Sequence, residues 1–339
     1  MKGKALIILL FLAGLVLPIP SARAQASGNQ VVVGVLFDHL RERWSRDRVA
    51  LTSEGTRLNA RVLVKSAESN DQMQIEQAKE LLNQGAQILL VVPHNLKKAG
   101  EIVEIAHQRK VKVIAYDRII RECDLDFYVS FDNEKVGELE AQYALSQAPI
   151  GNYVLLGGSP TDFNAIMIRK GQLKILEPLV QAGKIKIGFD QYTPEWKREN
   201  ARQNMETAYE KLSGELRAVL CGNDILAGGA ISVLEAKGKA GKVIVVAQDA
   251  ELEALQRIVK GSQAMTIYKP IPKLAQSAME LAIKIVRGEK INHLINKTIN
   301  NGFKEVPSQL LEPITVDKSN LDATIVQDGL YTRAQIYGQ

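Results

Sequence analysis

The sequence lacks the catalytic signatures that short motifs reveal. It contains no G-x-S-x-G elbow, no P-loop, no H-E-x-x-H motif and no G-x-G-x-x-G after the first expected strand. Its four histidines, His39, His94, His107 and His293, are dispersed, so their spacing indicates neither a metal cluster nor a triad. We therefore expect no enzyme activity, no metal and no cofactor. A glycosidase with paired carboxylates stays open, because any two acids at strand ends could converge.

Cysteine is scarce as well. Cys123 and Cys221 are the two cysteines of the chain, and they fall in different halves at no recognisable metal-binding spacing. Two buried free thiols are therefore favoured over one disulfide.

An excess of charge of either sign is also missing. The chain has 43 Lys and Arg against 38 Asp and Glu, and three of these cations, Lys2, Lys4 and Arg23, lie near the N-terminus. The remaining 40 cations nearly balance the 38 anions, which argues against a phosphate-binding surface for nucleic acid. With 46% hydrophobic and 24% charged residues, the 339-residue chain should fold as an ordinary globular protein, most simply as two domains.

Long apolar runs are absent except at the N-terminus. Lys2 and Lys4 precede an apolar stretch at 5–17, and Ala22-Arg23-Ala24 provides an A-x-A cleavage site. An uncleaved anchor would need about 20 apolar residues, and prolines interrupt this run earlier. Residues 1–24 are therefore predicted to be a signal peptide, which would send the mature protein to the periplasm or extracytoplasmic space.

From residue 29 onward, short apolar runs alternate with helix-length amphipathic segments. This pattern predicts an α/β fold of two doubly wound, mostly parallel-sheet lobes. The expected strands lie at 31–37, 61–66, 88–92, 111–116, 153–156, 186–189, 218–221, 243–247 and 264–267. The expected helices lie at 72–83, 96–109, 134–146, 165–181, 197–212, 226–237 and 274–286. The tail at 296–339 is expected to be irregular.

Polar and aromatic residues concentrate directly after the expected strands. These strand ends lie at 38–44, 116–118, 157–164, 190–196, 222–224, 248–249 and 268–270. Ligands of parallel sheets bind at this edge, and a mixture of Asp, Asn, Arg and Lys with aromatic rings suits a polyhydroxylated ligand. Each residue alone has a simpler interpretation as a helix cap, a salt bridge or a packing residue. Their joint position at one edge is what favours a binding site.

Six segments carry a resemblance to a known family. They are 41–44 (RERW), 115–118 (AYDR), 130–137 (SFDNEKVG), 157–160 (GGSP), 268–271 (YKPI) and 300–302 (NNG). Together they resemble the D-xylose-binding proteins of ABC sugar transport, within the type I periplasmic binding protein family. The similarity runs from about Val31 to about Tyr331.

The resemblance implies two α/β lobes joined by a three-segment hinge that close over a sugar. The N-terminal lobe would comprise residues 29–132 and 270–299, and the C-terminal lobe residues 133–269 and 300–333. The implied function is capture of a monosaccharide, most simply D-xylose, and its delivery to an ABC permease by a monomer. By position, the sugar-binding residues would be Arg43, Trp44, Asp117, Arg118, Asp162, Asn164, Trp196, Asn223, Asp249 and Lys269.

Three residues depart from the pattern of this family. Phe163 lies where a polar neighbour is expected, Tyr192 replaces a tryptophan, and Gly222 stands where serine is usual. These departures bear on sugar selectivity. Two alternatives to a transport role stay open: a sugar sensor that signals to a membrane histidine kinase or chemoreceptor, and an enzyme that acts on a pentose.

Overall fold

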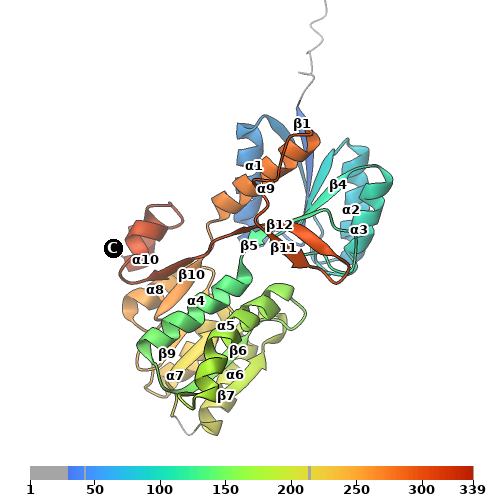
Figure 1. Cartoon of the computed structure of the whole chain (residues 1–339). Coiled ribbons are helices and arrows are strands. Elements are labelled where there is room, and N and C mark those ends of the chain that lie inside the picture. Colours follow the sequence, from blue (N-terminus) through green and yellow to red (C-terminus); the bar gives the residue numbers. More distant parts are fainter. Residues whose placement is uncertain (1–29, 42, 213–214, 339) are drawn as a thin grey trace, which may run out of the picture. The chain divides into compact units, whose positions relative to one another are not determined.

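The chain folds into two mostly parallel β-sheets, each covered by helices on both faces (Figure 1). The computed structural model describes residues 30–41, 43–212 and 215–338. The predicted signal peptide at 1–24 lies outside these residues. The predicted α/β fold of two parallel-sheet lobes is confirmed.

The first sheet has seven strands in the order β11-β12-β5-β4-β3-β1-β2. All neighbours are parallel except β11 and β12, which pair antiparallel. The interior strand β3 (ILLV) is buried along its whole length, as a parallel strand covered on both faces must be. The strands are β1 (Val31–Phe37), β2 (Ala60–Ser66), β3 (Ile88–Val91), β4 (Lys112–Tyr116), β5 (Phe127–Phe131), β11 (Lys297–Asn300) and β12 (Glu305–Leu311).

Two pairs of helices cover this sheet. Leu51 of α1 and Met279 of α9 belong to the apolar cluster on one face, and Ile75 of α2 and Ile102 of α3 to the cluster on the other. Figure 1 shows α1 and α9 side by side, although they lie far apart in the sequence. The helices are α1 (Arg43–Arg57), α2 (Asp71–Asn83), α3 (Gly100–Gln108) and α9 (Ile271–Val286).

The second sheet has six strands in the order β13-β10-β9-β8-β6-β7. Only β13 runs antiparallel to its neighbour among these described strands. Strand β8 (AVLC) is again wholly buried. The strands are β6 (Gly151–Gly157), β7 (Ile185–Tyr192), β8 (Ala218–Cys221), β9 (Ile244–Gln248), β10 (Met265–Tyr268) and β13 (Ile314–Asp317).

Helices α4 and α5 cover one face of the second sheet, and α6 and α7 cover the other. A further apolar cluster joins α8 to the C-terminal segment through Leu255, Ile325 and Ile336. The helices are α4 (Asn133–Gln147), α5 (Phe163–Gln181), α6 (Arg198–Lys211), α7 (Asp224–Ala236), α8 (Leu252–Lys260) and α10 (Arg333–Tyr337), with a 3₁₀ turn at Pro194–Trp196 and a π-helical turn at Asp322–Val326.

Glycines bring α4 and α5 into backbone contact. A Cβ atom at Gly137 would lie 1.9 Å from the carbonyl oxygen of Ile168, and one at Gly171 would lie 1.9 Å from that of Glu134. No larger residue fits at either position without separating the helices. The glycine of the SFDNEKVG segment is thus explained by helix packing.

The chain passes between the two sheets three times: after β5, after β10 and after β12. The first passage lies between β5 and α4, and the second lies between β10 and α9. The third lies later than expected, because β12 pairs with β5 in the first sheet through Ser308 to Leu311. Residues 305–311, which were assigned to the C-terminal lobe, therefore belong to the first sheet.

Each of the nine predicted strands has a counterpart, but several other elements were missed. The tail expected to be irregular contains β11, β12 and β13, and β5 was not predicted; β12 and β5 pair with each other across a long stretch of sequence. Helix α1 was missed because its buried face includes Asp47 and Gly55, which weaken the apolar period. Helix α8 was missed too, and α3 begins at Gly100 rather than at residue 96.

Candidate functional site

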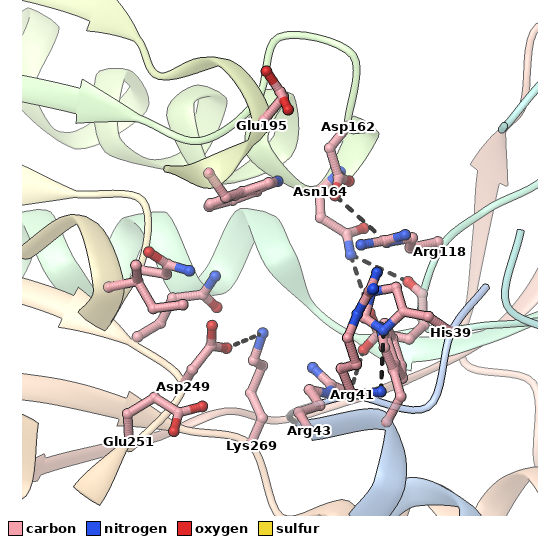
Figure 2. Close-up of a pocket in the computed structure, with 16 residues that line it drawn as sticks. His39, Arg41, Arg43, Arg118, Asp162, Asn164, Glu195, Asp249, Glu251 and Lys269 are labelled. Carbon is pink, nitrogen blue, oxygen red and sulfur yellow. Dashed lines mark hydrogen bonds and ion pairs between the residues drawn. The ribbon is translucent and has the colours of Figure 1, made fainter. Parts of the chain in front are cut away.

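A cavity of about 400 Å³ lies at the carboxyl ends of strands from both sheets (Figure 2). Each of the ten residues predicted from the sequence contributes to its wall: Arg43, Trp44, Asp117, Arg118, Asp162, Asn164, Trp196, Asn223, Asp249 and Lys269. Strand ends of the first sheet provide the first four, and strand ends of the second sheet provide the other six. The fold thus brings together residues that are up to 226 positions apart, from Arg43 to Lys269.

Arg43, at the start of α1, is held between two carboxylates. Its Nη2 donates to Asp117 Oδ2 at 2.7 Å, and its Nε donates to Asp47 Oδ2 at 3.3 Å. Burial alone would lower the pKa of Arg43, but the charges of Asp117 and Asp47 outweigh burial and raise it. Arg43 is therefore a fixed cation in the wall of the cavity.

Asp117 is kept ionised by its cationic neighbours. Burial favours the neutral acid, yet Arg43, Lys269 and Arg118 outweigh it and lower the pKa of Asp117. Asp47, one helical turn after Arg43, has a raised pKa because burial exceeds the effect of Arg43. The Asp117 carboxylate is consequently a negatively charged hydrogen-bond acceptor in the cavity wall.

The backbone at Asp117 is strained and tightly held. Its φ of 62° is in the left-handed region, which non-glycine residues rarely adopt. Its carbonyl oxygen accepts hydrogen bonds from the Tyr128 hydroxyl at 2.8 Å, the Ser130 hydroxyl at 2.9 Å and Asn164 Nδ2 at 3.3 Å. These contacts hold the backbone at Asp117 in place.

Arg118 connects the two sheets. Its Nη1 donates to Asp38 Oδ2 at 2.9 Å, and its Nε lies 3.6 Å from Asp162 Oδ2. Its guanidinium also lies 5.5 Å from the ring centroid of Trp44, and that of Arg43 lies 4.8 Å from the same ring. The buried Trp44 indole thus packs with both arginines in the first-sheet wall.

Asp162 and Asn223 both cap helices and both line the cavity. Asp162 caps α5 by accepting from the Asn164 backbone N–H at 2.9 Å, and Asn223 caps α7 by accepting from the Leu226 N–H at 3.0 Å. Both also line the cavity. Capping fixes these side chains at the cavity wall and uses only part of their hydrogen-bonding capacity.

Lys269 and Asp249 face each other at the ends of β10 and β9 (Figure 2). Lys269 Nζ lies 2.9 Å from Asp249 Oδ1, and Lys269 is only 7% exposed. Asp249 has a φ of 102°, so three predicted site residues, Asp117, Trp196 and Asp249, have a positive φ. The pair adds one cation and one anion to the second-sheet wall.

Six lining residues were not among the predicted site residues. Five of them lie within two positions of a predicted residue, which is the signal that could have found them, and His39 lies four positions before Arg43. They are His39, Arg41, Glu195, Ile225, Gln248 and Glu251. Gln248 is 3% exposed and donates through Nε2 to the Gly222 carbonyl oxygen at 2.9 Å.

The departures at Phe163 and Tyr192 do not lie in the cavity wall. Phe163 packs against an apolar cluster of the first sheet, and the Arg121 guanidinium lies 4.9 Å from its ring centroid. The Tyr192 ring lies 5.4 Å from the Arg169 guanidinium. Gly222 lies against the backbone of Gly158, because a Cβ atom there would be 2.6 Å from the Gly158 nitrogen.

The charges in the cavity compensate each other in pairs. Arg43 pairs with Asp117, Arg118 with Asp162 and Lys269 with Asp249. Such a wall offers donors and acceptors in fixed positions without a strong net field, which suits a neutral, hydroxyl-rich ligand better than an anion.

Within the described part of the chain, no group of three or more potential metal ligands occurs. No helix among the same residues has the length and apolarity required to span a membrane.

Comparison with known proteins places this cavity in context. A family model described as a periplasmic binding protein domain matches residues 33–290. The chain is 46% identical to the D-xylose-binding periplasmic protein of Haemophilus influenzae, over 93% of this chain and 94% of that protein. It is 43% identical to the D-xylose-binding periplasmic protein of Escherichia coli, over 92% and 94% of the two chains.

A solved structure has a similar fold. The carbohydrate transporter solute-binding protein of Chloroflexus aurantiacus, in complex with D-glucose, aligns with a TM-score of 0.81 at 27% identity. The alignment covers 90% of this chain and 98% of that protein.

Proposed function

The chain belongs to the family of periplasmic binding proteins, and we propose from this premise that it captures D-xylose and delivers it to an ABC importer. Two relatives that are 43% and 46% identical over nearly the whole chain carry D-xylose binding in their names, which supports D-xylose as the ligand. Like them, the chain is a binding protein and not an enzyme.

The observation that carries this proposal is the composition of the cavity wall. Three compensated ion pairs, three amide side chains and two indole rings surround about 400 Å³. Carboxylates and amides hydrogen-bond hydroxyl groups, while an indole covers the apolar C–H face of a sugar ring. Arg118, Asn223 and Asp249 are proposed to contact sugar hydroxyls directly, with Trp44 or Trp196 packed on the ring.

The proposed mechanism is ligand-driven closure of two lobes about a three-segment hinge. We take the lobes as the units around the two sheets, connected where the chain leaves β5, β10 and β12. Because each lobe contributes polar contacts, a sugar held by both stabilises the closed arrangement more than the open one. Small-angle scattering should therefore detect compaction when D-xylose is added.

Titration calorimetry of the mature protein tests the ligand. D-xylose should bind more tightly than D-ribose, L-arabinose and D-glucose, and it should be recovered chemically intact. Absence of D-xylose binding would overturn the proposal, and conversion of the sugar to a product would revive the enzyme interpretation.

The location and the partner are proposed on the same basis. We propose export with cleavage after Ala24, and intact-mass analysis of the exported protein would detect retention of residues 1–24. The proposed partner is the membrane permease of an ABC importer. Sugar-dependent stimulation of the reconstituted transporter would support it, whereas stimulation of a membrane sensor kinase alone would favour the sensory role.

A further inference from the structure

The indole of Trp196 rests on the backbone of Gly158, and we infer that Gly158 positions this ring and so determines which sugars the cavity accepts. A Cβ atom at Gly158 would lie 2.0 Å from Cη2 of Trp196 and 2.3 Å from both Cζ2 and Cζ3. Contacts this short require the indole or the loop to move. Gly158 is not among the residues with positive φ, so the contact with the indole, and not backbone conformation, requires glycine here.

The segment that carries Trp196 cannot move freely. The backbone N–H of Thr193 donates to the carbonyl oxygens of both Gly157 and Gly158, at 2.9 Å each. Glu195 and Trp196 have φ values of 56° and 55°, in the strained left-handed region. The loop after β7 is therefore attached to the loop after β6, and the position of the indole follows that of Gly158.

A second glycine supports the first. A Cβ atom at Gly222, after β8, would lie 2.6 Å from the backbone nitrogen of Gly158. Gly222 is held in turn by Gln248, and it immediately precedes Asn223 in the cavity wall. The ends of β6, β7 and β8 thus converge on a tight contact that fixes both Trp196 and Asn223.

This inference rests on the proposed sugar-binding function and makes it more specific. An aldohexose such as D-glucose differs from D-xylose by one hydroxymethyl group, and a rigid wall discriminates between ligands that differ by one such group. Moving the Trp196 indole would change the space next to the bound ring. The affinities for the two sugars should then change by different factors.

The first experiment compares Gly158→Ala with the unaltered protein by titration calorimetry against D-xylose and D-glucose. We expect the dissociation constant for D-xylose to rise at least tenfold and the ratio of the two constants to change at least threefold. Gly188→Ala is the matched control, because its Cβ would meet only the flexible Leu212 side chain, 2.3 Å away in the apolar core. That control should lower stability and leave the ratio unchanged; an unchanged ratio in Gly158→Ala would overturn the inference.

A double-mutant cycle tests whether Gly158 acts through the indole. In a Trp196→Ala background, Gly158→Ala should change D-xylose affinity by less than twofold, because the ring that it displaces is absent. Equal losses in both backgrounds would contradict the inference. If Gly158→Ala alone does not fold, Trp196→Phe combined with it should restore folding and bring the D-xylose affinity within threefold of Trp196→Phe alone; failure of this rescue would also contradict it.

A measurement without sugar separates this inference from the proposed function. The chain has two tryptophans, so Trp44→Phe leaves Trp196 as the single indole fluorophore. Adding Gly158→Ala should shift the emission maximum and alter acrylamide quenching. If the unaltered protein binds no aldose, the proposed function fails, but the fluorescence still reports the position of the indole. Identical spectra and quenching with and without Gly158→Ala would overturn the role of Gly158.

Discussion

Asn164 and Asp117 are joined across the two sheets, because Asn164 Nδ2 lies 3.3 Å from both the carbonyl oxygen and Oδ1 of Asp117. Asn164 follows β6 of the second sheet, and Asp117 follows β4 of the first. Two residues that are proposed to bind the sugar are thus hydrogen-bonded to each other in the sugar-free protein. The contact couples the ligand site to the association of the lobes.

Asn164→Ala should weaken D-xylose binding about tenfold or more and also lower the melting temperature of the sugar-free protein. A buried polar group left without its partner costs about 1 to 3 kcal/mol. The Asn164 amide is proposed to take part in sugar binding as well as in the contact with Asp117, so its loss should reduce both affinity and stability. Calorimetry and thermal unfolding of one preparation measure both effects. Asn296→Ala is the control, since its hydrogen bonds to Leu310 lie within the first sheet; it should lower stability without changing affinity.

Asp249→Ala and Arg118→Ala should each reduce D-xylose affinity by tenfold to several hundredfold, since each removes a proposed hydroxyl contact. From the sequence alone, little change in the sugar-free protein would be expected. The structure adds a stability loss, because Asp249→Ala leaves the buried Lys269 without its ion-pair partner. Arg118→Ala removes one partner of the buried Asp38, which retains its contact with His94, so its stability loss should be smaller.

Affinity and melting temperature measured on both variants test this prediction. Asp124→Ala, which removes an exposed carboxylate paired with Lys304, should alter neither quantity appreciably. Normal D-xylose affinity in both site variants would remove these residues from the proposed site.

Glu140 should make stability fall as pH rises. It is fully buried in α4, accepts from Gln172 Nε2 at 2.6 Å through Oε2, and has no hydrogen-bond partner at Oε1. Burial raises the pKa of Glu140 from 4.5 to about 8. The folded protein therefore holds a proton that the unfolded chain releases between these values, and its free energy of unfolding decreases across that pH range.

Glu140→Gln removes this titrating group and should weaken the dependence of stability on pH. Urea unfolding at pH 5, 6, 7 and 8 measures the free energy of unfolding. Between pH 5 and pH 8 this free energy should fall by about 1 to 3 kcal/mol more in the unaltered protein than in the variant. Burial also raises the pKa of Asp224 to about 7, so a smaller dependence should remain in the variant. Parallel curves for the two proteins would contradict the assignment to Glu140.

Gly137→Ala should destabilise the protein by about 1 to 3 kcal/mol or more, because its new Cβ would lie 1.9 Å from the Ile168 carbonyl oxygen. Gly228→Ala is a matched substitution in helix α7, where the Cβ would meet the flexible Arg198 and Arg257 side chains at 3.3 Å. There the gain in helix propensity should leave stability unchanged or slightly higher. Chemical denaturation of both variants measures the difference, and equal stabilities would refute the close helix contact.

Cys123 and Cys221 should titrate as two free thiols, but only after unfolding. Both are buried and unbridged, as predicted from the sequence. Burial raises the pKa of Cys123 to about 11 and that of Cys221 still further, so neither forms a reactive thiolate at neutral pH. Thiol titration of the exported protein, purified without reductant, should find two groups in guanidinium and almost none in buffer; fewer than two in guanidinium would indicate oxidation.

The candidate site was largely accessible from the sequence because polar residues follow strands at predictable places. Asp117 and Asp249 come directly after apolar strands, and the carboxyl ends of parallel strands meet at one edge. Arg41 and Gln248 were not selected, although they are neighbours of predicted residues. Their types are common on ordinary surfaces, so their position in the wall emerges only when the strands are assembled.

By itself, the sequence determined the class of fold and the edge where the polar groups gather, because apolar runs and strand-end residues are local patterns. The tertiary structure decided what depends on contacts between distant segments. It added β12 to the first sheet beside β5, where Ser308 pairs with Tyr128 and Leu311 with Phe131, each 180 positions earlier in the chain. This backbone pairing leaves no local pattern in the sequence. It also paired Asn164 with Asp117 and set the Trp196 indole on Gly158, because such distances depend on how separate loops approach one another.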